Sequence, residues 1–228
     1  MKKICFVFGT RPESIKLAPL ITALKKETAF KVITCITSQH TTLLQSVLTH
    51  FKIIPNHNLN IMQPNQTLFD ITTQCLSKLN SMYSKEKPDL VVVQGDTTSA
   101  FSASLAAYYS KIPIAHIEAG LRTHQHNNPF PEEINRRLIS ELATYHFAPT
   151  QQNKENLKKE NHTNNIWVVG NTGIDALKQT LSEIKTNPTI NTIKNKIDLT
   201  KKLILVTGHR HENIGPPFYE LCDALTTL

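Results

Sequence analysis

The chain has 228 residues, 39% of them hydrophobic, which is enough for one large domain or for one domain and part of another. No apolar run approaches the roughly 20 residues of a membrane span, and the short run after Met1 ends too soon in charged residues to be a signal peptide. The net charge of +7 suits a phosphate-bearing ligand, whereas an aromatic fraction of 7% and the lack of a basic helical stripe argue against nucleic acid.

Strand-like and helix-like stretches alternate along the chain. The first predicted elements are a strand at 3–8, a helix at 14–26, a strand at 30–37 and a helix at 41–51. A loop at 52–66 follows. The next elements are a helix at 67–83, a strand at 90–93, a helix at 99–109 and a strand at 112–118. A polar loop at 119–131 leads to a helix beginning near 132, a strand at 145–148, a helix at 151–160, a strand at 166–169 and a helix at 174–185. This order predicts an α/β fold with a doubly wound parallel sheet.

The lysine- and asparagine-rich stretch 186–202 marks a boundary, beyond which 203–207 predicts a fresh strand followed by a helix. Residues 1–170 are therefore predicted to form a Rossmann-like domain. Residues 171–228 are predicted to form a hinge helix, a linker and the start of a second domain. One β-α unit cannot bury its own faces, so we expect either a fragment of a longer protein or a missing half supplied from elsewhere.

Polar residues follow the predicted strands at the edge where open α/β sheets bind their ligands. Asp96 follows the strand at 90–93, and a general acid/base role there competes with a role as helix N-cap. His116 and Glu118 alternate along the next strand and are expected on the same side, with Arg122 as a counter-charge. Gly120 would permit a close backbone approach.

Basic residues stand in the first strand-to-helix turn. The stretch 9–13 matches neither the dinucleotide fingerprint nor the P-loop, yet Arg11 and Lys16 are placed to hold a phosphate or carboxylate near a helix N-terminus. An ordinary surface pair is the alternative. For the helix near 132, the alternative to a functional role is a set of i,i+4 ion pairs, Glu132 with Arg136 and Glu133 with Arg137.

Metal and cysteine chemistry find little support. His124 and His126, like His209, His211 and Glu212, lack the spacing of known zinc sites, so no metal is predicted. No nucleophile elbow is present. The cysteines are widely spaced and without a C-x-x-C pair, which predicts reduced, buried thiols of a cytoplasmic protein; they are Cys5, Cys35, Cys75 and Cys222.

Taken together, the motifs identify a family. The chain resembles the non-hydrolysing UDP-N-acetylglucosamine 2-epimerases in family order along its whole length. The matching stretches are 8–13 (FGTRPE), 39–40 (QH), 59–64 (LNIMQP), 95–98 (GDTT), 116–123 (HIEAGLRT), 129–136 (PFPEEINR), 170–172 (GNT) and 207–210 (TGHR) with Glu212 and Asn213.

The resemblance implies a glycosyltransferase-B-type fold of two domains, here incomplete in the second, with the sugar nucleotide between them. It implies C2 epimerisation of UDP-GlcNAc to UDP-ManNAc by elimination and re-addition of UDP, without a cofactor, for cell-surface polysaccharide precursors. It also implies a homodimer when full length. Because family members continue for well over a hundred nucleotide-binding residues, a protein ending at Leu228 is expected to be inactive alone.

Residue roles carry over by position. The resemblance implies acid/base roles for Asp96, Glu118 and Glu132, and an active-site role for His209 on the second domain. The implied substrate-binding residues are Arg11, Lys16, Asp96, Glu118, His209 and Arg210, and Gln39 and His40 lie in the allosteric region. Thr41 and the stretch 123–127 depart from the bacterial pattern, which puts allosteric control in question.

The resemblance leaves open which carboxylate is the acid and which is the base. Three other functions remain as alternatives: a hydrolysing epimerase that releases ManNAc, a glycosyltransferase, and a non-catalytic half that binds a sugar nucleotide or a partner protein.

Overall fold

The computed structural model describes residues 1–37, 41–63, 65–184, 196–198, 200–206 and 215–227. The chain forms two compact units, Met1–Ser182 and Glu183–Leu228. The boundary falls within the last helix of the first unit, α7 (Thr172–Ile184).

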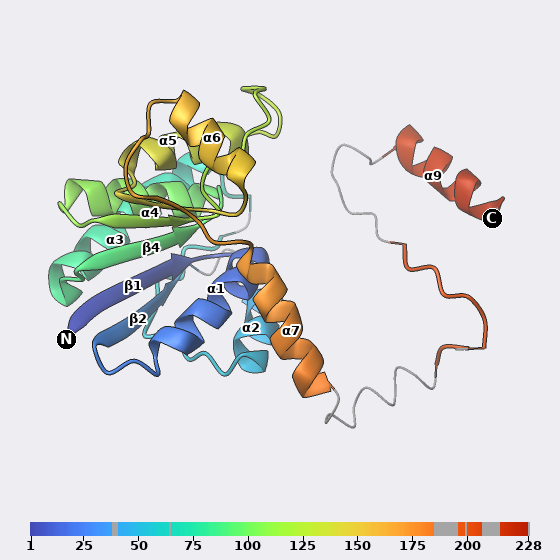
Figure 1. Ribbon diagram of the computed structural model, residues 1–228, viewed down its shortest axis with the longest axis horizontal. Coiled ribbons are helices and arrows are strands. Elements are labelled where there is room, and N and C mark those ends of the chain that lie inside the picture. The colour runs from blue at the N-terminus through green and yellow to red at the C-terminus, as the bar shows by residue number, and fades with distance from the viewer. Residues whose placement is uncertain (38–40, 64, 185–195, 199, 207–214, 228) are drawn as a thin grey trace. The chain divides into compact units, whose positions relative to one another are not determined.

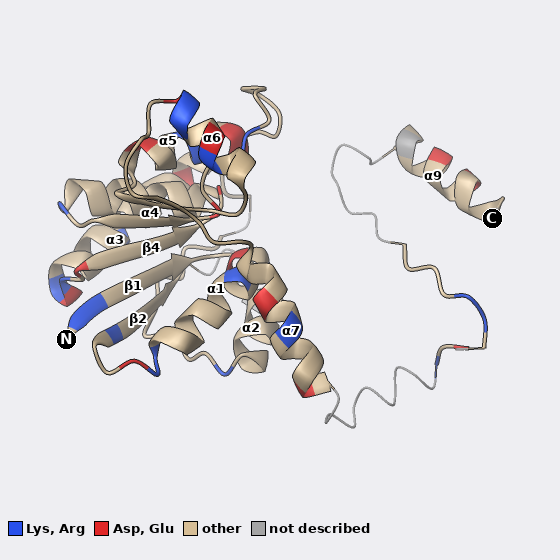
Figure 2. Cartoon of the chain, viewed as in Figure 1, with Lys and Arg blue, Asp and Glu red and all other residues tan. Residues whose placement is uncertain are grey.

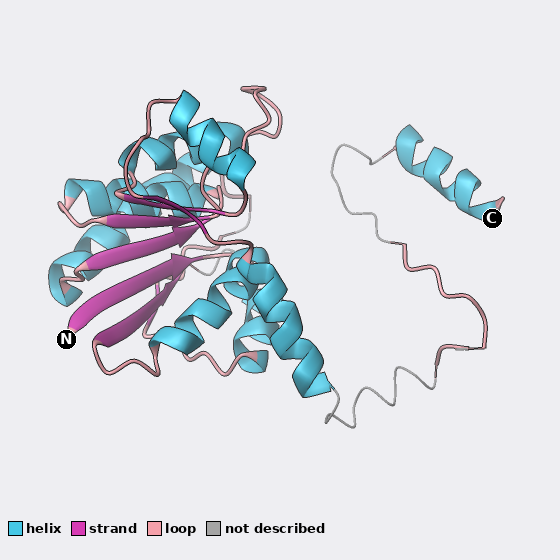
Figure 3. Ribbon diagram, in the orientation of Figure 1, coloured by secondary structure: helices cyan, strands magenta, loops and turns pink. Residues whose placement is uncertain are grey.

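The first unit is built on one parallel sheet (Figures 1 and 3). Its strands are β1 (Lys2–Phe8), β2 (Phe30–Ile36), β3 (His57–Asn58), β4 (Leu90–Gln94), β5 (Ile114–Ile117), β6 (Tyr145–Ala148) and β7 (Ile166–Val168), in the order β3-β2-β1-β4-β5-β6-β7. Figure 2 shows the strands almost free of charge, with lysines near the amino ends of β1 and β2. Uncharged, near-continuous apolar runs are typical of strands covered on both faces.

Helices cover both faces of this sheet. They are α1 (Arg11–Leu24), α2 (Thr41–His50), α3 (Leu68–Glu86), α4 (Thr98–Tyr109), α5 (Glu132–Leu142) and α6 (Gln151–Lys159), together with α7. One hydrophobic cluster joins the sheet to α3, α4 and α5, through side chains such as Leu79, Ala103 and Ile139. A second joins it to α1, α2 and α7, through Leu17, Leu48 and Ala176. The predicted doubly wound α/β fold is therefore confirmed.

The helix starts show why the elements begin where they do. Thr10 and Thr67 each form a capping box with the carboxylate three residues later, at α1 and α3. Thr97 and Thr150 cap α4 and α6 through their hydroxyls. These side chains satisfy backbone N–H groups that would otherwise lack partners in the first turn of each helix.

Three sequence-based expectations about the fold are wrong. The loop predicted at 52–66 contains β3, whose two residues pair with the end of β2. The strand predicted at 203–207 is not formed over 203–206, its described part, and the described residues of that unit contain no strand. Cys222, on α9 (Pro216–Thr226), is an exposed thiol rather than a buried one; Cys5, Cys35 and Cys75 are free and buried as predicted.

A helix that crosses a membrane must be both long and predominantly apolar. In the described part of the chain, no helix combines these two properties to the extent that a membrane span needs.

Candidate active site

The candidate site lies where the carboxyl ends of the central strands meet. The chain order reverses between β1 and β4, which are neighbours in the sheet, and the helices that follow them cover opposite faces. Such a reversal leaves a crevice at the carboxyl edge, where open α/β sheets bind ligands. The turns after β1, β4 and β5 bring their polar residues to this edge.

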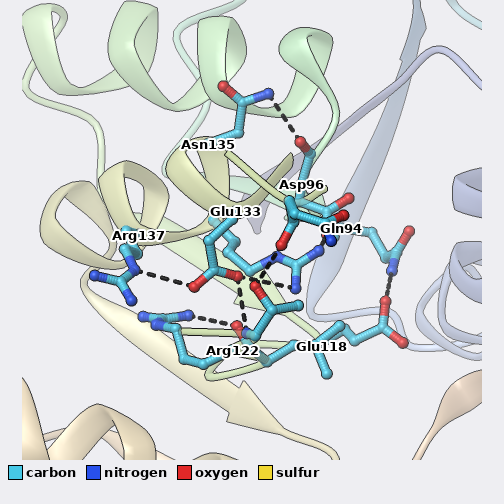
Figure 4. A network of polar contacts seen from close by, with 12 residues as sticks. Gln94, Asp96, Glu118, Arg122, Glu133, Asn135 and Arg137 are labelled. Carbon is cyan, nitrogen blue, oxygen red and sulfur yellow. Dashed lines mark hydrogen bonds and ion pairs between the residues drawn. The ribbon is translucent and has the colours of Figure 1, made fainter. Parts of the chain in front are cut away.

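Asp96 binds a buried arginine. Its Oδ2 lies 2.5 Å from Arg136 Nη2, and Asn135 Nδ2 donates a hydrogen bond of 2.9 Å to its backbone carbonyl (Figure 4). The alternative of Asp96 as helix cap is wrong, because Thr97 is the N-cap of α4 and accepts from the N–H of Ala100. The Asp96 carboxylate is therefore free of a capping role.

The pKa of Asp96 is raised above its ordinary value. Burial is the largest cause, because it penalises the charged form. Arg136 opposes this increase, whereas the charges of Glu118 and Glu132 add to it. Glu118 and Glu132 are therefore close enough for their charges to affect the ionisation of Asp96.

Glu118 is held by donors from distant parts of the chain. Lys16 Nζ lies 2.6 Å from its Oε2 and 2.8 Å from its Oε1, Gln94 Nε2 donates to Oε2 at 2.6 Å, and Asn171 Nδ2 donates to Oε1 at 3.2 Å. Lys16 therefore supplies the counter-charge that the sequence assigned to Arg122. Arg122 instead pairs with Glu160 at 2.6 Å, with its own side chain fully buried.

The backbone turns at Glu118. Its φ of +69° lies in the left-handed region, which is unusual for a residue with a side chain and is often found at functional sites. Strand alternation ends at Ile117, so it does not fix the direction of Glu118 relative to His116. The close approach expected at Gly120 is confirmed, because a Cβ there would clash with the carbonyl oxygen of Asn153.

His116 has a structural place in the site. Its ring is fully buried, and its Nε2–H donates a 2.8 Å hydrogen bond to the carbonyl of Gly95, in the turn that carries Asp96. Burial lowers the pKa of His116 to about 3, so the ring is neutral at pH 7. His116 therefore supports the Asp96 turn as a neutral donor.

The first turns of α5 order the preceding loop. The fully buried Glu133 accepts hydrogen bonds from the backbone N–H groups of Thr123 and His124, and it pairs with Arg137 at 3.1 Å and Arg136 at 3.4 Å. The predicted Glu133–Arg137 pair is confirmed, whereas Arg136 reaches Asp96 and Glu133. Burial opposes ionisation of Glu133, but the Thr123 hydrogen bonds and both arginines outweigh it and lower its pKa.

Sequence reasoning missed Glu13. This carboxylate is buried and accepts from the backbone N–H groups of Gly9 at 3.0 Å and Thr10 at 2.7 Å, and from the Thr97 hydroxyl at 2.8 Å. It therefore joins the turn after β1 to the turn after β4. Burial raises its pKa against the pull of these hydrogen bonds. The capping-box pattern Thr10-x-x-Glu13 is the signal that would have identified it.

Replacing Thr97 by alanine is expected to lower the free energy of unfolding by about 2 kcal/mol. The change removes the α4 cap and leaves one oxygen of buried Glu13 without its donor. Thr97→Ser keeps the hydroxyl and should cost less than about 0.5 kcal/mol. Urea denaturation of both variants checks this, and equal losses would contradict the role given to the hydroxyl.

The remaining predicted residues are distributed as follows. Glu132 begins α5, and Arg11 lines a hollow of about 400 Å³ between α1, α2 and α7, beside Phe51 and Leu177. Gln39, His40, His209 and Arg210 lie outside the described residues. Over the ranges that the structure covers, no three His, Cys, Asp or Glu side chains are grouped in a way that could hold a metal ion.

A comparison with protein families identifies a match. The family described as UDP-N-acetylglucosamine 2-epimerase matches residues 22–228. Similar relatives include the UDP-N-acetylglucosamine 2-epimerases of Salmonella typhimurium and Escherichia coli, each 47% identical over 99% of this chain. The chain spans 61% of the length of each of these two relatives.

Solved structures agree with this match. The UDP-GlcNAc 2-epimerase of Neisseria meningitidis bound to UDP-GlcNAc superposes with a TM-score of 0.92 and 45% identity, over 99% of this chain and 64% of that one. The Methanocaldococcus jannaschii UDP-GlcNAc 2-epimerase in complex with UDP-GlcNAc and UDP gives 0.80 and 39%, over 86% and 54%.

Proposed function

The chain belongs to the UDP-N-acetylglucosamine 2-epimerase family, and from this premise we propose that it carries the acid/base part of an enzyme that interconverts UDP-GlcNAc and UDP-ManNAc. The observation that carries the proposal is the pairing of carboxylates and cations at one sheet edge, Glu118 with Lys16 and Asp96 with Arg136. The similar structures from Neisseria meningitidis and Methanocaldococcus jannaschii bind UDP-GlcNAc.

The proposed reaction needs a base, an acid and cations. A carboxylate takes the C2 proton while the bond from C1 to the UDP oxygen breaks, which leaves a C1–C2 double bond and UDP. UDP then returns to C1 as a second group protonates C2 from the opposite face. Asp96, Glu118 and Glu132 are the proposed acid/base groups. The raised pKa of Asp96 makes its carboxylate a better proton acceptor than a free aspartate, which supports its place among these groups.

The substrate contacts are also proposals. Arg11 and Lys16, with His209 and Arg210, are proposed to bind the substrate, and Gln39 and His40 to belong to an allosteric region. The substrate-binding role is least directly supported for Lys16, because its ammonium group already pairs with Glu118. A bound phosphate would have to share this ammonium group with Glu118. No cofactor and no nucleic acid enter the proposed reaction.

The proposed protein is larger than this chain. We propose a glycosyltransferase-B-type homodimer of the cytoplasm, with residues 1–170 as the first domain and 171–228 as hinge helix, linker and start of the second. The chain spans 61% of its Escherichia coli relative, and by resemblance the remainder binds the nucleotide. The 228-residue chain alone is therefore expected to show no turnover.

Incubating the complete gene product with UDP-GlcNAc in D2O tests the function. We expect UDP-ManNAc to form and proton NMR to show deuterium at C2 in both sugars, because the abstracted proton exchanges with solvent. Release of free ManNAc would show a hydrolysing epimerase instead. Turnover with protium retained at C2 would refute proton abstraction there.

Glu118→Gln should lower kcat at least about 100-fold.

A further inference from the structure

The Glu118 carboxylate receives one donor that the proposed chemistry does not require. Lys16 and Gln94 account for Oε2, and Lys16 also reaches Oε1. The additional donor on Oε1 is the side-chain amide of Asn171 at 3.2 Å, 53 residues further along the chain. The Glu118 side chain is largely buried, with 17% of its surface exposed to solvent. Each of these donors therefore contributes to the orientation of its carboxylate.

The orientation of the Asn171 amide follows from a second contact. Its Oδ1 accepts a 2.9 Å hydrogen bond from the backbone N–H of Gly173, in the first turn of α7. With the oxygen occupied in this way, the NH2 group is the part that faces Glu118. The reversed amide would place two donors together and two acceptors together, so both contacts select the same orientation.

The residue type also points beyond helix capping. Aspartate caps helix starts as well as asparagine does, but at position 171 it would place a second negative charge against Glu118. Gly173 fits the same arrangement, because a Cβ there would lie 3.0 Å from Asn171 Oδ1 and 3.8 Å from Lys16 Cγ. The start of α7 is thus fitted closely to the two side chains that hold Oε1.

Helix α7 continues from this contact to the boundary between the two units at Ser182. Near its other end, Thr180 Oγ1 lies 3.0 Å from His50 Nε2 on α2. We propose that Asn171 is a positioning residue that orients the Glu118 carboxylate and ties it to the helix leading into the second unit. The catalytic meaning of this tie rests on the proposed function.

A double-mutant cycle between Asn171 and Glu118 tests the tie in the 228-residue chain, without turnover. Asn171→Asp should lower Tm by about 4 °C at pH 7.5, because it keeps the cap and adds a like charge. In a Glu118→Gln background the same change should move Tm by less than about 1 °C, since the neutral amide can donate to the new carboxylate. An equal loss in both backgrounds means that Asn171 only caps α7, and overturns the proposal.

The matched control is Asn161→Asp, which makes the same change on the exposed turn after α6 and should give equal effects in both backgrounds. In the complete gene product, Asn171→Asp should lower kcat about tenfold or more with KM changed less than about threefold. A change confined to KM would overturn the positioning role. Absence of turnover in the wild type would refute the proposed function and leave the thermal cycle to decide the Asn171–Glu118 coupling.

Discussion

Replacing Arg136 by methionine is expected to lower the free energy of unfolding by about 3–5 kcal/mol at pH 7. The Arg136 side chain is only 7% exposed and contacts two carboxylates, Asp96 at 2.5 Å and the fully buried Glu133 at 3.4 Å. Methionine fills a similar volume and suits a helix. The loss therefore comes from leaving buried negative charge without its partner, which costs more than the ion pair contributes.

Arg137 on the same helix provides the control for this substitution. Arg137→Met removes a contact with the same Glu133, but Arg137 is 28% exposed, and we expect a loss of about 1 kcal/mol. Urea denaturation at pH 7 measures both variants. Similar losses for the two would show that burial of the charge is not what makes Arg136 important, and Arg136→Lys should recover part of the loss.

Acid is expected to destabilise the first unit because of two buried histidines. Burial lowers the pKa of His116 to about 3 and that of His146 to about 4, whereas an unfolded histidine titrates near 6.5. Between these values the unfolded chain binds more protons than the native chain, so stability is full above about pH 6.5 and falls as the pH decreases. At pH 5 the two histidines together should cost about 3–4 kcal/mol.

Variants that cannot titrate isolate this effect. His146→Phe keeps a ring beside His162, whose ring centroid is 5.3 Å away, and His116→Gln keeps a donor for the Gly95 carbonyl. Each should make the loss of unfolding free energy between pH 7 and pH 5 smaller by about 2 kcal/mol. His126→Gln, on the exposed loop before α5, should leave it unchanged. Carboxyls with a raised pKa, Asp96 and Glu13, act in the opposite direction and are common to all variants.

Local pattern was sufficient for most of the fold. The apolar runs at Leu90–Gln94 and Lys2–Phe8 are strands because both sheet faces are covered, and a buried run reads the same in sequence and in structure. The predictions from local pattern were wrong at two segments. The two residues of β3 lie in an asparagine-rich stretch, and the run beginning at Leu203 has no described strand to pair with in its unit.

The site was only partly predictable, because its contacts join distant residues. Lys16 and Glu118 are 102 residues apart, and no spacing rule relates them. At Asp96 the sequence left a helix-cap role and an acid/base role as alternatives, and the structure assigns the cap to the next residue, Thr97. Glu13 was within reach of local reasoning, since its capping-box pattern is a short-range signal; its contact with Thr97, 84 residues away, was not.

The long sequence separations between the residues that hold Glu118 also bear on how the site forms during folding. Closing a short loop costs less conformational entropy than closing a long one, so contacts between distant residues are the more costly to form. Glu118 receives its donors from residues 16, 94 and 171, so its hydrogen bonds are complete only when α7 has packed on α1 and α2. A partly folded molecule with an intact sheet but a detached α7 would retain Lys16 and Gln94 at Glu118 and lack Asn171.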